Sequence, residues 1–235
     1  MKKLATLAAG LVAATALMAQ PAVHSFSVTP RIGFNTSMLT NNGYGRMYTI
    51  KTDDHTTHFV KADTDCGFGV AGGLEFGYQL TRRFGLTAGV IYSHQGAKRE
   101  KAEGWSPAPF HIDDNSYLTL DYINVPVLAN FYVWRGLAVK VGLQPGILLA
   151  AKDHLDVGGG GKSEDVTDHR TLDVKSRCNT IDLSIPVGIS YEFDSGIMFD
   201  ARFNLGANDV FKHSKGSNIV LQMTVGYKFK MGGKR

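Results

Sequence analysis

In the segment IDLSIPVGISYEF, residues 181–193, apolar and polar side chains alternate without interruption. Every odd position is apolar, whereas the even positions carry Asp, Ser, Pro, Gly, Ser and Glu. Strict alternation of this kind is typical of a β-strand whose two faces meet different surroundings. Residues 67–79 and 84–95 repeat the pattern, and no amphipathic helix stands out after residue 25. The chain is therefore predicted to be all-β.

The same alternation predicts eight strands, at residues 26–38, 66–79, 84–96, 117–134, 137–152, 179–193, 197–207 and 218–230. Most are long enough to cross a bilayer at a tilt, which needs about 9–11 residues. Their connections alternate between short turns, at residues 80–83, 135–136 and 194–196, and much longer loops. An even strand number with short periplasmic turns and long extracellular loops predicts an eight-stranded, antiparallel, up-and-down transmembrane β-barrel.

A soluble ligand-carrying barrel is the alternative fold. Such a barrel has an apolar interior and a polar exterior. Here one face of the strands carries large apolar residues, and the other is polar and rich in glycine. That division favours a lipid-facing exterior and a polar lumen.

Composition excludes several classes of protein. The 235 residues include 27 Gly, 7 Pro and 2 Cys, and 43% are hydrophobic. These values do not fit a collagen-like, disulfide-rich or disordered chain. The net charge is +4, but Lys and Arg are scattered along the chain, so no nucleic-acid partner is predicted.

The N-terminus resembles a secretory signal peptide. Lys2 and Lys3 precede an apolar run from Leu4 to Ala19, which is too short for a membrane-spanning helix of about 20 residues. We therefore expect a cleavable signal peptide at residues 1–19 and a barrel domain at residues 20–235.

Aromatic residues gather near the short-turn ends of the predicted strands. An aromatic band at one level is typical of a membrane interface, so we expect a periplasmic girdle in contact with outer-membrane lipids. Its predicted members are Tyr78, Phe84, Phe131, Tyr191, Phe193, Phe199, Tyr227 and Phe229.

The alternation also predicts which charged residues face the lumen. An eight-stranded barrel is just filled by its own side chains, and an unpaired charge inside it is costly. We therefore expect a plug of salt bridges and hydrogen bonds, with a narrow channel or a proton path as the alternative. The predicted network consists of Glu75, Lys140, Asp182, Glu192, Asp200, Arg202 and Lys228.

Two further groups of residues are candidates for a metal site and for a disulfide. His55 and His58 follow two aspartates in the order D-D-H-x-x-H, but no third ligand is defined, so solvated histidines are expected and a metal site is not. Cys66 and Cys178 head strands on opposite sides of the ring. A disulfide needs Cα atoms within about 7 Å, so a bridge is left open and depends on loops that fold over the mouth.

No catalytic residue or cofactor is predicted. A hydrolytic barrel needs a nucleophile and a base side by side, and Ser93 with His94 is the one such adjacency near the extracellular rim. Neighbours in a strand point to opposite faces, so these two cannot form a dyad.

Residues YLTLDYINVPVLANFY, 117–132, resemble the central strand of PorT-like outer-membrane β-barrel proteins. The segments GLQPG, 142–146, and DARFNLG, 200–206, are similar to later strands of that family, and GYKF, 226–229, to its last strand. The resemblance implies a barrel in the outer membrane of a Gram-negative bacterium. The namesake of the family contributes to protein secretion, so a component of a secretion or assembly system is one expected function.

Aromatic residues among mixed charges in the long loops, such as Trp105 and Phe110, are common at protein-binding surfaces. The expected role is therefore non-enzymatic, structural or partner-binding through the extracellular loops. The secretion component, a narrow channel and a lipid-modifying enzyme remain the alternatives.

Overall fold

The computed structural model describes residues 23–40, 49–50, 58–59, 64–99, 102–106, 108–112, 116–159 and 166–232. The predicted signal peptide, residues 1–19, lies outside these ranges. The strands are β1 (Phe26–Leu39), β2 (Thr49–Ile50), β3 (His58–Phe59), β4 (Thr64–Gln79), β5 (Phe84–Arg99), β6 (Ala102–Ser106), β7 (Ala108–Ile112), β8 (Tyr117–Asn124), β9 (Val127–Trp134), β10 (Leu137–Gly159), β11 (Val166–Asp173), β12 (Ile181–Glu192), β13 (Ile197–Gly206), β14 (Asn218–Tyr227) and β15 (Phe229–Met231).

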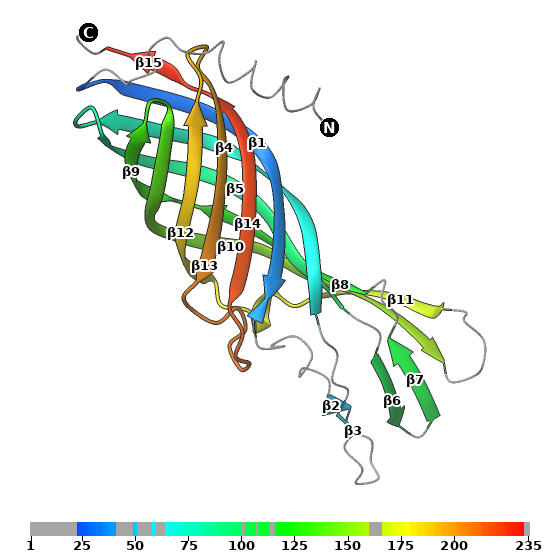
Figure 1. The fold of residues 1–235 in the computed structure, drawn as a ribbon. Helices are drawn as coiled ribbons and strands as arrows, with labels where there is room; N and C mark the ends of the chain where they lie inside the picture. Colours follow the sequence, from blue (N-terminus) through cyan, green and yellow to red (C-terminus); the bar gives the residue numbers. More distant parts are fainter. Residues whose placement is uncertain are drawn as a thin grey trace, which may run out of the picture.

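The long strands close into an antiparallel ring (Figure 1). The order is β1, β4, β5, then β8 followed by β9, then β10, β12, β13 and β14, and β14 pairs again with β1. Closure leaves no sheet edge inside the bilayer, where unpaired backbone groups would be costly. The predicted all-β barrel is confirmed.

The strand count differs from the eight predicted, because the main sheet contains 13 strands. The predicted fourth strand is divided at Val125 and Pro126, since proline has no N–H to donate, and the last strand is divided at Lys228. In addition, β6, β7 and β11 continue the sheet beyond the ring at the end that carries the long loops (Figure 1). We call this the long-loop end, and the opposite one the short-turn end.

The exterior of the ring is apolar. Phe68, Ile32 and Ile181 are 72%, 68% and 65% exposed, and their neighbours on the same face are similar. So large an exposed apolar surface is expected of a barrel surrounded by lipid. Among the described residues, no helix is long and apolar enough to cross a membrane.

One irregularity reverses the faces of β10. The pairing with β8 shifts between Leu148 and Ala150, which is a β-bulge. As a result Leu148 and Ala151 are both buried, although an uninterrupted strand would direct them to opposite faces.

The lumen and the two ends of the barrel

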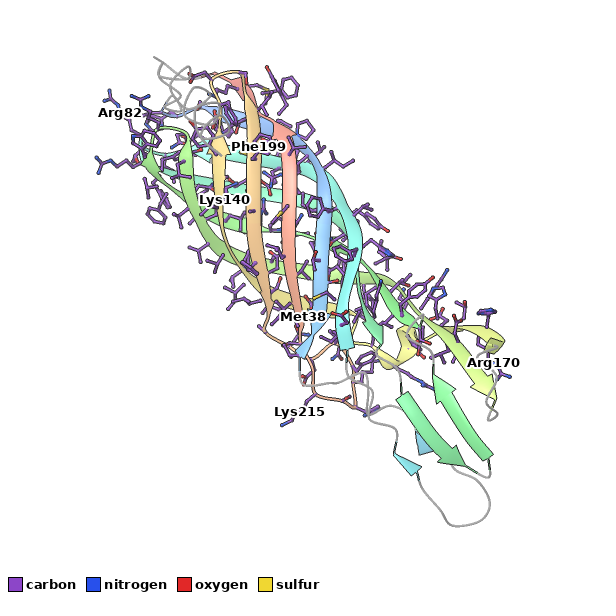
Figure 2. The ribbon with its side chains drawn as sticks, turned by 45° about the vertical axis from the view of Figure 1, so that its right-hand side comes forward. Met38, Arg82, Lys140, Arg170, Phe199 and Lys215 are labelled. Carbon is purple, nitrogen blue, oxygen red and sulfur yellow. The ribbon has the colours of Figure 1, made fainter. Side chains whose placement is uncertain are left out.

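A cluster of five charged side chains fills the middle of the lumen. Arg31 on β1, Glu75 on β4, Lys140 on β10, and Asp200 and Arg202 on β13 are each at most 5% exposed. Figure 2 shows the level of Lys140, between Phe199 toward the short-turn end and Met38 toward the long-loop end. The cluster therefore joins four strands of the ring.

Two carboxylates are shared among the three cations. Arg202 Nη2 lies 2.6 Å from Glu75 Oε1, and Arg202 Nε lies 2.5 Å from Asp200 Oδ1. Lys140 Nζ is 2.6 Å from Asp200 Oδ2, and Arg31 Nη2 is 2.7 Å from Glu75 Oε2. Charge-assisted bonds of this length are strong, and their loss leaves a buried charge without compensation. The cluster therefore occupies the middle of the lumen and links four strands of the ring through ion pairs.

A second ionic group lies at the short-turn end. Glu192 receives Lys228 Nζ at 2.8 Å on Oε2 and Lys230 Nζ at 2.6 Å on Oε1. Lys228 Nζ also donates to the Tyr132 hydroxyl at 3.1 Å. The predicted network is thus divided into two groups, and Asp182 belongs to neither, because it sits half-buried opposite Gly146 near the long-loop end.

On the long-loop side of the charge cluster, amides and hydroxyls continue the polar filling of the lumen. Asn35 Nδ2 donates to Ser93 Oγ at 2.8 Å, and Gln95 Nε2 donates to the same oxygen at 2.7 Å. Asn218 Nδ2 donates in turn to Gln95 Oε1. All four side chains are at most 5% exposed.

The long-loop end of the lumen is closed by apolar side chains, which we call the apolar cap. The cap consists of Leu39, Ala97, Leu118, Leu120, Tyr122, Leu148, Ala151, Val174, Cys178, Val210 and Phe211. The expectation that large apolar residues face outward along every strand is therefore wrong for β8. There the apolar residues point inward, because they pack against loop segments that fold into the mouth.

These loop segments are held by backbone pairing. The short 3₁₀ helix η2 (Lys175–Arg177) precedes Cys178, which forms an isolated antiparallel bridge with Phe211. Lys212 N donates to Arg177 O at 3.0 Å, and Asn179 N donates to Val210 O at 2.8 Å. The loop before β12 and the loop before β14 are therefore paired with each other in the mouth of the barrel.

Both cysteines are free, so the disulfide left open above is not formed. Cys178 is 1% exposed, and burial is the main cause that raises the pKa of its thiol to about 11. Because only the thiolate reacts, alkylation of Cys178 should be negligible at neutral pH and increase as the pH approaches 11. Half-buried Cys66 should react before Cys178. Mass spectrometry after timed alkylation measures the two rates, and a Cys66→Ser variant is the control. Fast labelling of Cys178 at pH 7 would contradict a closed cap.

The predicted girdle residues pack in pairs at the short-turn end. Ring centroids lie 4.9 Å apart for Phe84 and Phe131, 4.8 Å for Tyr191 and Phe193, and 4.7 Å for Tyr227 and Phe229. Tyr78 packs in the same way, 4.7 Å from Phe26, a residue that the sequence analysis did not include. Phe199 contacts Phe193 at 5.8 Å.

Of the remaining candidates, His55 lies outside the described residues, and the side chain of His58 is not described. No group of three or more metal-ligating side chains occurs in the described part of the chain. Ser93 and His94 face opposite sides, as expected, since Ser93 bonds Asn35 inside whereas His94 Nδ1 lies 2.6 Å from Asp121 Oδ1 outside.

Arg31 is the member of the charge cluster that sequence reasoning missed. Its position between the outward residues Pro30 and Ile32 was a usable signal, because it placed Arg31 on the inward face of β1. The inward residues of the apolar cap had no such signal.

The geometry is that of a closed barrel with an apolar outer wall, and the family comparison agrees with a barrel of the outer membrane. Residues 18–212 match the model of the outer membrane protein beta-barrel domain. The chain belongs to this family. It is therefore an integral β-barrel protein of a Gram-negative outer membrane, while the finer resemblance to PorT-like barrels stays a prediction. No curated protein matches the chain.

Several solved barrels are similar to the chain. Ail of Yersinia pestis, in complex with the heparin analogue sucrose octasulfate, is 14% identical over 88% of this chain and 100% of its own, with a TM-score of 0.46. Neisserial surface protein A is 14% identical over 87% and 97%, with a TM-score of 0.44. OprG of Pseudomonas aeruginosa is 13% identical over 91% and 99%, with a TM-score of 0.41.

Proposed function

We propose that the protein is a non-enzymatic surface-binding protein, in which the barrel is the membrane anchor and the sheet beyond the long-loop end binds a protein partner. The observation that carries this proposal is that the barrel wall continues beyond the ring, as the outer part of β10 and as β11, which pairs with it. Strand β10 is 23 residues long, roughly twice what a transmembrane strand needs, so a large part of it lies outside the bilayer.

The extension offers main-chain and side-chain contacts together. Within the described part of the chain, β11 pairs with β10 alone, so that no described strand lies along its other edge. Residues 169–173 are exposed on both faces of the strand, and Leu172 is 43% exposed. Such an edge accepts an additional strand, with side chains adding specificity. An extended segment of a partner protein is the chemistry that fits.

Neighbouring side chains give the extension an ordered face. Tyr117 and His154 stack with ring centroids 4.4 Å apart, and the Thr171 hydroxyl is 3.0 Å from His154 Nδ1. His169 Nδ1 lies 2.7 Å from Asp156 Oδ1. An aromatic ring held in place loses little entropy on binding, which favours recognition.

Site-specific photo-cross-linking in intact cells tests the proposal. A photoreactive residue at Leu172 should give one defined adduct, whereas the same residue at Lys215, in the loop between β13 and β14 at the same end (Figure 2), should give little. Equal adducts at both positions, or none, would contradict recognition by β11. Adducts with secretion machinery would instead support the alternative of a secretion or assembly component.

A further inference from the structure

A groove of about 450 Å³ crosses the lipid-facing wall of the barrel. It runs over five adjacent strands, from β10 across β12, β13 and β14 to β1. Its lining is almost entirely apolar and includes Leu137, Tyr191, Ile189, Ala201, Met223 and Phe34. Because it opens on the outer wall, its occupant comes from the membrane.

Ala201 is the smallest of the outward-facing residues that line the groove. Along β13, Ala201 lies between Phe199 and Phe203, which are 54% and 53% exposed. Across the sheet it pairs with Ile189 on β12 and Met223 on β14, which are 55% and 39% exposed. Side chains that project on all sides of an alanine leave a depression in the wall at that position.

Leu137, which lines one end of the groove, lies two residues after a cation, Arg135. Leu137 directly follows the turn at Arg135 and Gly136, at the short-turn end, and pairs with Tyr191 of the aromatic band. The guanidinium carbon of Arg135 lies 5.5 Å from the centre of the Trp134 ring, and Trp134 is 56% exposed. This stacking holds the charge at the membrane surface, where a lipid phosphate lies.

We propose that the groove and Arg135 together form a binding site for one glycerophospholipid of the leaflet at the short-turn end. One acyl chain lies in the depression over Ala201, and the phosphate accepts hydrogen bonds from Arg135. The cation at the interface matches the phosphate of such a lipid. The apolar groove, which ends at Leu137 two residues from Arg135, matches an acyl chain. The site also depends on the membrane location of the barrel, but it does not depend on a protein partner at β11.

Lipid retention tests the site. The protein is purified in mild detergent with added phosphatidylethanolamine, and bound lipid is measured by native mass spectrometry. We expect one retained lipid on the wild type and loss of this species in Ala201→Phe, which fills the depression. Val90→Phe is the matched control, because Val90 already projects from the lipid-facing wall, 50% exposed on β5 across the ring, so this change fills no depression and should retain the lipid.

A second variant, at Arg135, tests the contact with the lipid headgroup. Arg135→Gln should lose the preference for phosphatidylethanolamine over diacylglycerol, which lacks the phosphate, while keeping the apolar contact. The site is wrong if Ala201→Phe retains lipid like the wild type, if lipid A is retained in place of a phospholipid, or if a second barrel copy occupies the wall. Heat-modifiability on unboiled gels confirms that each variant is folded, and unchanged cross-linking at Leu172 separates this test from that of the proposed function.

Discussion

Arg202→Met should lower the free energy of unfolding by about 3–5 kcal/mol, because it leaves buried carboxylates without their main partner. Arg202 bonds Glu75 at 2.6 Å and Asp200 at 2.5 Å, and all three side chains are 1% exposed. Urea unfolding of the barrel in detergent micelles or lipid vesicles, followed by tryptophan fluorescence, measures the change.

Two variants control this experiment. Gln222→Met replaces another long buried side chain, which accepts one neutral hydrogen bond from Asn204 at 3.3 Å, so its cost should be only about 1–3 kcal/mol. In the double variant Glu75→Met with Arg202→Met, the loss in free energy of unfolding should be smaller than the sum of the losses in the two single variants, because the two side chains contact each other. Additive losses, or a stable Arg202→Met protein, would show that the cluster does not brace the barrel.

Phe211→Ala, in the apolar cap at the long-loop end of the lumen, should lower the free energy of unfolding by a similar amount. Phe211 is 2% exposed in the apolar cap, and removal of a buried phenyl ring costs about 3–5 kcal/mol. Because its backbone pairs with Cys178, the same change should make the Cys178 thiol accessible to alkylation at neutral pH. Unfolding and labelling rates are therefore expected to change together.

Leu172→Ala is the control for the cap variant. It removes a side chain of similar apolar character that is 43% exposed on β11, so its effect on stability should stay within about 0.5 kcal/mol. If Phe211→Ala leaves both stability and Cys178 labelling unchanged, the apolar cap does not close the mouth of the barrel.

The positions of the transmembrane strands were predictable because lipid outside and polar groups inside impose a period of two. Each predicted segment corresponds to a strand, or to two strands divided at a proline or at Lys228. The charged residues on β4, β10 and β13 followed from the same period. Which of them meet was not predictable, because register between strands and the reach of a guanidinium are set in three dimensions.

The apolar cap shows where the pattern stops being informative. Leu118, Leu120 and Tyr122 alternate with Thr119 and Asp121 as a lipid-facing strand would, yet they point inward. The reason is that loops far along the chain, around Val174 and Phe211, supply an apolar surface inside the mouth. Periodicity identifies two faces but not which face meets apolar surroundings.

Single-channel recording tests whether the lumen is closed at two levels. The folded protein is inserted into planar bilayers, and insertion is verified by heat-modifiability of protein recovered from vesicles of the same lipid. We expect no conductance steps above the lipid baseline, because the charge cluster around Arg202 and the apolar cap around Phe211 both block the passage. Discrete, reproducible conductance steps from the wild-type protein would show that the lumen is open and that the protein is a channel.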